Sequence, residues 1–218
     1  MVEKCKLNPT RNILAIHSTN NYFGFAYKDI NDKNSNENFF IKKFDRDLSN
    51  NLILDLSEFL PRRSFDSIER ISISNGPANF NATRLIVVLA RTISQQIKCP
   101  LDYFSCYRIM ARRIAIKNNI SKSKKDFWIL NNLKHRGYIA GKFMIDINSY
   151  KNDFFEIKEL IKPRLYKDID DINIYYEVDY DTRDDLKELL RLSLENHNDS
   201  VCPSWEDVLP IYPISPIN

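Results

Sequence analysis

The stretch IERISISNGPANFNATRLIVVLARTISQQI, residues 68–97, decides the architecture. Its first part, residues 68–74, alternates apolar and polar side chains and predicts a strand. Residues 79–97 predict a long helix, and residues 100–105 predict another strand. A strand, a helix and a strand in this order indicate two parallel strands joined by a right-handed crossover.

The turn between this strand and this helix has its own signals. Gly76 permits backbone geometry that other residues resist, and Pro77 fixes the next step. Asn79 or Asn81 is expected to cap the helix. Taken alone, these residues indicate a tight connection and no particular ligand.

The residues before this stretch extend the sheet. NILAIHS (12–18) and NYFGFAY (21–27) predict a hairpin, and FFIKKF (39–44) predicts a third strand. Residues 48–60 have the apolar spacing of a helix, which Pro61 ends. With a basic helix at 106–118, the order over residues 12–118 is β-β-β-α-β-α-β-α. This α/β order is typical of one lobe of the actin-like ATPase fold and of ribonuclease H-like nucleases.

After residue 118, a shorter and less regular version of this order of strands and helices follows. Residues 126–130 and 135–147 predict a second hairpin, and residues 153–161 and 172–178 predict two more strands. Residues 182–196 predict an amphipathic helix with acids in its first turn. We therefore expect an actin-like two-lobe fold with a truncated second lobe. The predicted units are 1–105 and 106–218, and the Pro-rich tail is expected to pack back on a lobe as extended chain.

Composition excludes several classes of protein. The chain of 218 residues has no apolar run of the ~18 residues that a membrane span needs. Its first residues contain no apolar segment of the kind a secretory signal carries. The four cysteines, at positions 5, 99, 106 and 202, form no C-x-x-C pair, which predicts a reduced cytoplasmic protein without a zinc knuckle. Only four residues are glycine, so a phosphate-cradling loop is not expected.

Charge is unevenly distributed along the chain. Residues 98–142 hold 11 Lys and Arg against 2 acids, whereas residues 143–218 hold 8 against 17. A basic segment of this kind fits contact with an RNA backbone, or equally a solvated face balanced by the acidic C-terminal part.

The turn and the first strand together carry a family resemblance. The GPxxFxxxR arrangement of Gly76, Pro77, Phe80 and Arg84 resembles the TsaB (YeaZ) family, as do ILAIHST at 13–19 and the Cys-Pro-Leu at 99–101. The tail is similar to that of cyanobacterial-type members. The resemblance covers most of residues 12–110 and returns at roughly 182–217.

The chain also departs from the family pattern, as a diverged member would. His17 stands where members usually have Asp, Ala78 and Ala82 where they have Gly, and Asn81 where they have Thr. Of a further common stretch, only Tyr138 is retained within residues 131–138.

The resemblance implies a function. TsaB is the non-catalytic dimerisation subunit of the bacterial complex that forms threonylcarbamoyladenosine in ANN-reading tRNAs. Its implied partners are a TsaD-like catalytic subunit, a TsaE-like ATPase and, through the complex, tRNA. No cofactor is implied, and a homodimer through the helices of the first lobe is a further expectation.

The residues themselves favour binding over catalysis. His17 and the glycine-free turn after it predict no ATP site, because Mg²⁺ and phosphates need carboxylates and flexible loops. Glu69 is the one carboxylate on the strands where a ribonuclease H-like nuclease needs several. The three histidines, at positions 17, 135 and 197, are scattered, and no histidine close in sequence activates a cysteine.

Helix 79–97 is apolar on two sides, which predicts that both are covered. We expect Ala82, Leu85, Ile86, Leu89 and Ile93 to face the sheet. The second side is covered either by helix 48–60 within the chain or by a partner seated on both helices. The candidate partner interface comprises Leu52, Leu56, Phe80, Arg84, Val87, Val88 and Arg91.

The basic segment supplies a second candidate surface. The residues predicted to contact tRNA phosphates are Arg108, Arg112, Arg113, Lys122, Lys124 and Lys125. Two other functions stay open from sequence alone: a small-metabolite kinase of the same fold, and a stand-alone RNA-binding module.

Overall fold

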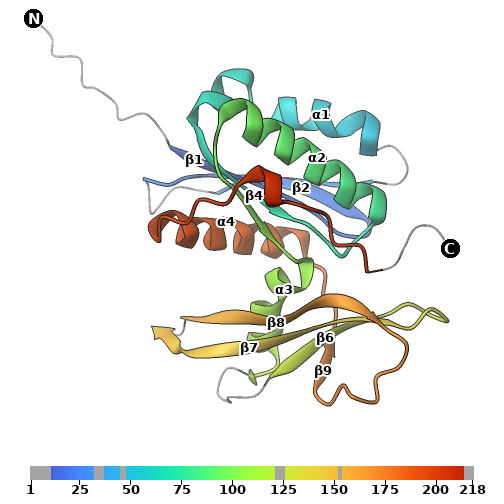
Figure 1. Ribbon diagram of the computed structural model, residues 1–218. Helices are drawn as coiled ribbons and strands as arrows, with labels where there is room; N and C mark the ends of the chain where they lie inside the picture. The colour runs from blue at the N-terminus through green and yellow to red at the C-terminus, as the bar shows by residue number, and fades with distance from the viewer. Residues whose placement is uncertain (1–10, 32–36, 45–47, 121–125, 152–153, 214–218) are drawn as a thin grey trace, which may run out of the picture.

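The computed structural model describes residues 11–31, 37–44, 48–120, 126–151 and 154–213. Its elements are layered: two helices lie above a five-stranded sheet, one helix lies below it, and a four-stranded sheet forms the opposite end of the molecule (Figure 1). This is the predicted actin-like α/β fold with two lobes. Within the described ranges, no helix has the length and apolar character required to cross a membrane.

The larger sheet has the strand order β3-β2-β1-β4-β5. β1 pairs antiparallel with β2 and parallel with β4, while β2–β3 is antiparallel and β4–β5 is parallel. The predicted hairpin extended by parallel strands is therefore confirmed. The strands are β1 (Asn12–Ser18), β2 (Tyr22–Asp29), β3 (Asn38–Lys43), β4 (Ile68–Ser74) and β5 (Leu101–Phe104).

The central strand β1 is buried along its whole length. Successive side chains of a strand point to opposite faces, so Leu14 and Ile16 enter the upper core while Ile13 and Ala15 enter the lower one. Because helices cover both faces of the sheet, the strand is a continuous apolar run rather than an alternating one.

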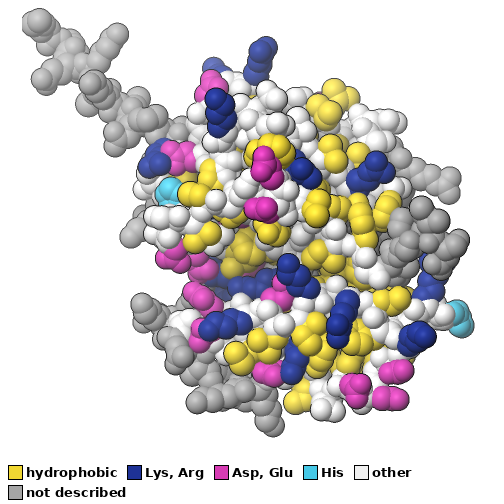
Figure 2. Space-filling view, viewed as in Figure 1, with side chains coloured by type: hydrophobic (Ala, Val, Ile, Leu, Met, Phe, Trp, Pro, Cys, Tyr) yellow, Lys and Arg dark blue, Asp and Glu magenta, His cyan; other side chains and the backbone are white. Residues whose placement is uncertain are grey.

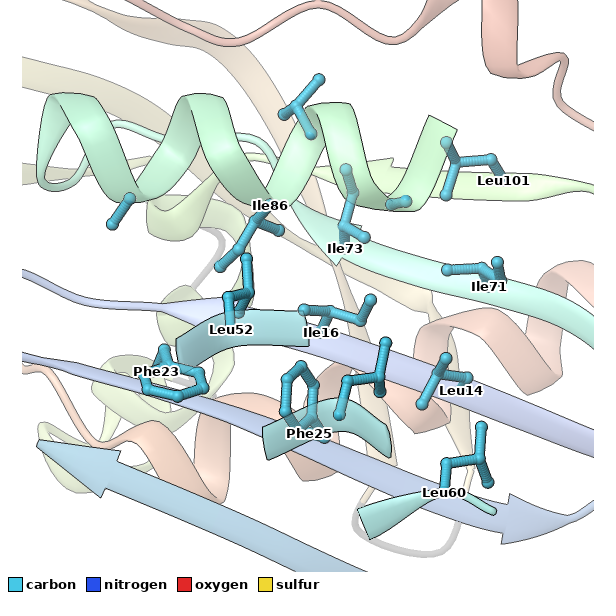
Figure 3. Packing of buried hydrophobic residues seen from close by; sticks show 14 of the residues in the cluster. Leu14, Ile16, Phe23, Phe25, Leu52, Leu60, Ile71, Ile73, Ile86 and Leu101 are labelled. Carbon is cyan, nitrogen blue, oxygen red and sulfur yellow. The ribbon is translucent and has the colours of Figure 1, made fainter. Parts of the chain in front are cut away.

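Helices α1 (Leu48–Phe59) and α2 (Phe80–Ile97) cover the upper face. Asn79 is the N-cap of α2, and its side chain accepts a hydrogen bond from the Ala82 N–H at 3.1 Å. A short 3₁₀ helix, η1 (Arg62–Ser67), links α1 to β4. Figure 3 shows the core between helices and sheet, where side chains of all these elements interlock: Leu14, Ile16, Phe23, Phe25, Leu52, Leu60, Ile71, Ile73, Ile86 and Leu101.

The buried face of α2 differs from the one predicted. Leu85, Leu89 and Ile93 are only partly buried, and Val87 turns into the core instead. The buried face is centred on Ile86 and Val87, so these three long side chains lie at its margin, where they still pack against the core. The fully buried positions of α2 are Ala82, Thr83, Ile86, Val87, Ala90 and Ser94.

Helix α4 (Thr182–Asn198) covers the lower face of the same sheet. Asp181 caps it, accepting hydrogen bonds from the N–H groups of residues 183 and 184 at 3.0 Å each. Leu186, Leu189 and Leu190 pack in one cluster with apolar side chains of β1 and β2. The last long helix of the chain thus completes the core of the first lobe.

The smaller lobe is a four-stranded sheet, in the order β8-β7-β6-β9, with one helix on its inner face. Tyr107, Met110 and Ile114 of that helix pack against Phe127 and Phe143 of the sheet. The elements are α3 (Cys106–Lys117), β6 (Phe127–Asn132), β7 (Tyr138–Lys151), β8 (Phe154–Tyr166) and β9 (Tyr175–Glu177).

The packing of the two lobes can be set beside the predicted units, residues 1–105 and 106–218, which stay a prediction. The two sheets do lie on either side of residue 105. However, α4 packs against strands of the first sheet, because that sheet's lower face would otherwise expose apolar side chains. The chain therefore starts in the large lobe, builds the small lobe, and returns to the large one.

The C-terminal tail follows the same return path, as predicted. After a 3₁₀ turn, η3 (Trp205–Asp207), the chain runs across α2 and β4 (Figure 1). Val208 is fully buried in the upper core, and the Ile211 N–H donates to the Asn75 carbonyl at 2.7 Å. The Asn75 side-chain amide donates to the Leu209 carbonyl at 2.9 Å.

A buried ion pair ties β4, β5, α4 and the start of the tail together. Arg70 Nη1 donates to both carboxylate oxygens of Asp102, at 2.8 and 3.0 Å, and its Nη2 donates to the Val201 carbonyl. Ser193 and Asn196 of α4 donate to the same carboxylate at 2.6 and 2.7 Å. The Arg70 and Asp102 side chains are 2% and 0% exposed.

Asp102→Asn is expected to destabilise the protein by about 3–5 kcal/mol, because it leaves the buried guanidinium without its counter-charge. Chemical denaturation of both proteins measures the difference. The matched control is Glu69→Gln, near the start of β4. It removes a carboxylate whose ion pair with Arg11 is partly exposed to water, so its effect on stability should be far smaller. Equal losses from the two variants would contradict the central role of the Arg70–Asp102 pair.

Candidate functional site

The carboxyl ends of β1 and β4 lie side by side and face the smaller lobe. His17 is the next-to-last residue of β1 and Ser74 is the last of β4, and His17 Nδ1 lies 2.7 Å from Ser74 Oγ. His17 Nε2 lies 3.2 Å from a carboxylate oxygen of Asp185 on α4. Because a carboxylate only accepts hydrogen bonds, Nε2 carries the proton that faces Asp185.

Ser74, His17 and Asp185 form a hydrogen-bonded chain of the kind that activates a nucleophilic serine. The three residues are only 0–2% exposed, so a substrate does not reach the hydroxyl in this structure. The other oxygen of Asp185 accepts from Arg113 of α3 at 2.6 Å. The geometry thus supports a structural role, in which His17 and Asp185 join β1, α4 and α3 across the boundary between the lobes.

The turn after β4 is in contact with the tail. Gly76 has a φ of +101°, and a Cβ at this position would lie 2.9 Å from the Ile211 carbonyl oxygen. The Gly76 carbonyl accepts from the Cys106 N–H at 2.7 Å, at the start of α3. Position 76 therefore needs glycine because the backbone has a positive φ and the tail packs directly against it.

Among the described residues, no group of three or more His, Cys, Asp or Glu is placed to hold a metal ion. Glu69, the carboxylate considered for a nuclease, forms an ion pair with Arg11 at the start of its strand. His135 and His197 lie in the turn after β6 and in the last turn of α4, far along the chain from His17.

Two of the cysteines are buried and weakly acidic. Burial raises the pKa of the Cys106 thiol to about 12, and burial raises that of Cys99 to about 11. A thiolate is the reactive form, so both side chains are inert near neutral pH. Cys202, in the tail, is exposed.

The predicted partner interface is divided by the structure. Leu52, Leu56 and Val87 are 2–3% exposed and belong to the core beneath the helices. Val88 is 55% exposed, and Arg84 also faces solvent. A partner seated on α1 and α2 would therefore meet Val88 and Arg84, while the three buried side chains support that surface from below.

Two further apolar side chains on α1 are exposed and were not among the predicted interface residues. Ile53 is 67% and Leu54 61% exposed. A groove of about 770 Å³ lies between the first turns of α1 and α2, with Leu48 on one side and Leu85 and Val88 on the other; Ile53 and Leu54 do not line it. Hydrophobic side chains are visible at the surface over these helices in Figure 2. The α1–α2 surface is defined here as Ile53, Leu54, Arg84, Leu85 and Val88.

The tail of the chain itself contacts the remaining two predicted residues. The Phe80 ring lies 4.5 Å from the Tyr212 ring, measured between centroids. The Arg91 guanidinium lies over the Trp205 ring at 5.5 Å and donates to the Val208 carbonyl at 3.3 Å. Phe80 and Arg91 thus hold the tail on α2.

The arginines predicted to contact tRNA lie on α3 and face α4. Arg113 pairs with Asp185, and Arg112 lies 3.6 Å and Arg108 4.0 Å from Glu188. Their side chains are 12–21% exposed, and their charges are largely paired with acids of α4 at the junction between the lobes. Lys122, Lys124 and Lys125 lie outside the described residues.

The strand order and the two lobes define an α/β protein of the actin-like ATPase fold. No protein-family model and no curated protein sequence matches the chain, so the assignment of the fold rests on structure alone.

Among solved structures, YeaZ from Pseudomonas aeruginosa is similar at a TM-score of 0.63 and 11% identity, covering 93% of this chain and 99% of that one. A second Pseudomonas aeruginosa structure, described as similar to peptidase YeaZ, has a TM-score of 0.62 and 11% identity, and covers 94% of this chain and 100% of the other. The chain therefore has a YeaZ-like fold over nearly all of both proteins.

Cys202 is expected to react with a maleimide within minutes at pH 7, whereas Cys99 and Cys106 react only after unfolding, because burial keeps them as thiols. Peptide mass spectrometry of a Cys5→Ser protein, labelled with and without denaturant, gives the positions. Rapid labelling of Cys106 in the native protein would show that the junction between the lobes opens.

Proposed function

We propose that this protein is a non-catalytic scaffold subunit of the TsaB type, which binds a TsaD-like catalytic subunit that forms threonylcarbamoyladenosine in ANN-reading tRNAs. A YeaZ-like fold over 93% of the chain supports this proposal. So does the GPxxFxxxR arrangement, in which Gly76 and Phe80 both contact the tail. The same proposal places the protein in the cytoplasm.

The observation that carries the proposal is the α1–α2 surface. Ile53, Leu54 and Val88 each have more than half of their side-chain surface exposed. Clustered apolar side chains with an arginine at their edge, here Arg84, are typical of protein interfaces. The groove that Val88 and Arg84 line offers a partner helix a place to pack.

The chemistry of the remaining residues supports a role without catalysis. The serine hydroxyl of the Ser74–His17–Asp185 chain is enclosed, and the two buried thiols have raised pKa values. Asp185, the carboxylate closest to the end of β1, is already bonded to His17 and Arg113. These contacts favour a scaffold over the kinase alternative, for which a free carboxylate at this position would be needed.

The other partners follow from the same assignment. We propose that a TsaE-like ATPase joins the pair and that, without TsaD, two copies of this chain associate through the α1–α2 surface. Contact with tRNA through the basic segment is part of the proposal. Because Arg108, Arg112 and Arg113 are engaged with α4, this contact depends mainly on Lys122, Lys124 and Lys125.

Val88→Asp is expected to weaken co-purification with a TsaD-like subunit by about tenfold or more, because a charge would be buried at the centre of the interface. Size-exclusion chromatography and titration calorimetry of the two purified subunits measure the loss.

The matched control for this variant is Leu165→Asp, which places the same charge on an apolar side chain of the other lobe that is 39% exposed. It should leave the complex intact. If Val88→Asp folds normally and binds as tightly as the unchanged chain, the interface is elsewhere.

Replacing Lys122, Lys124 and Lys125 with Ala is expected to weaken tRNA binding by the assembled complex and to flatten its dependence on salt. Each lost phosphate contact removes about one released counterion from the slope of log K against log salt. Filter binding at several salt concentrations measures the slope. An unchanged slope would remove tRNA contact from this segment.

A further inference from the structure

A cavity of about 240 Å³ lies between the two lobes, next to the carboxyl ends of the parallel strands β1 and β4. In open α/β sheets, ligands bind at this edge. Segments far apart in the chain meet around it: the β1–β2 turn, the β4–α2 turn with the start of α2, α3, β6 and β7, the segment before α4, and the tail. Its lining residues are Asn20, Pro77, Ala78, Phe80, Tyr107, Asn131, Leu133, Ile139, Tyr180, Ile211, Tyr212 and Pro213.

No charged side chain lines this cavity, although 28% of the chain is Asp, Glu, Lys or Arg. Burial raises the pKa of Tyr107 and Tyr180, so both hydroxyls stay protonated and neutral. A charged ligand would lose its hydration here without gaining a counter-charge. The cavity therefore selects against phosphates, carboxylates and ammonium groups.

The polar groups that are present favour a ring with both donors and acceptors. Phe80, Tyr180 and Tyr212 supply aromatic surface, on which flat rings stack, whereas the Tyr107 side chain behind them is fully buried. The Asn131 side chain makes no hydrogen bond with the described residues, so its amide is available to a ligand. A carboxamide bonds a purine edge through one donor and one acceptor, as asparagine does with adenine in nucleic acids.

The volume of the cavity further limits which ligands can bind. The cavity volume is about 240 Å³. That is enough for a two-ring heterocycle and too little for the same ring with a sugar and three phosphates, since pockets for larger ligands measure about 300–1,000 Å³.

We propose that the cavity between Asn131, Phe80 and Tyr180 is a binding site for an uncharged, purine-sized heteroaromatic ring. The ring would lie between the aromatic side chains, with its polar edge bonded to the Asn131 amide. Because Asn131 and Tyr107 belong to the small lobe and Ala78 and Phe80 to the large one, a bound ring joins the lobes. This site is separate from the α1–α2 surface, so its presence does not depend on the scaffold function.

The test uses adenine as the probe, with the full chain. Saturation-transfer NMR should show saturable binding of adenine at millimolar concentrations, and the melting temperature should rise with adenine concentration. Asn131→Leu should weaken the affinity about tenfold. Its matched control is Asn132→Leu, whose side chain lies on the opposite face of β6 and accepts from the Lys134 N–H, and which should bind as the unchanged chain does.

A second variant fills the space instead of removing a hydrogen bond. Ala78→Phe should abolish adenine binding while leaving co-purification with a TsaD-like subunit unchanged. Absence of saturable adenine binding, or equal binding by the Asn131→Leu variant, would overturn the proposal. Binding of Mg·ATP at least tenfold tighter than adenine would also overturn it, because an uncharged lining offers nothing to the phosphates.

Discussion

The buried carboxylate of Asp102 is the point on which the large lobe depends. It accepts four hydrogen bonds, two from Arg70 and one each from Ser193 and Asn196, and so fixes β4, β5 and α4 in one arrangement. Arg70 extends the connection to the start of the tail through Val201. A buried ion pair is stabilising only where its geometry is good and its remaining polar atoms are hydrogen-bonded. Most polar atoms of the Arg70–Asp102 pair have such a partner.

A second polar network performs the same task between the lobes. His17, Ser74, Asp185 and Arg113 bring the ends of β1 and β4 into contact with α4 and α3. Ser74, His17 and Asp185 resemble a hydrolytic triad in residue type and spacing, but their burial supports a structural role. Side chains with reactive chemistry thus hold strands and helices together, while Ile53, Leu54 and Val88 are exposed on α1 and α2.

Local sequence signals predicted most of the elements, because strand alternation and helix spacing are properties of neighbouring residues. The strand at 68–74 and the helix at 79–97 are present within one residue of the prediction. The orientation of α2 was less predictable, since Val87 and Leu85 are equally apolar and only the contact with the sheet distinguishes them. The pairing of Asp185 with His17 spans 168 positions and leaves no local pattern. For the same reason, the sequence left two interpretations of the basic segment, RNA contact and balance by the acidic C-terminal part, and only the fold shows that its arginines face acids of α4.

The return of α4 and the tail to the first sheet has a consequence for biosynthesis. The lower face of that sheet has no cover until residues 182–198 have left the ribosome, and the upper core lacks Val208 until later still. Nascent chains usually complete their N-terminal domain first. Here the small lobe is synthesised in the interval, so the large lobe stays unfinished, with apolar strands accessible to chaperones, until α4 and Val208 have been made.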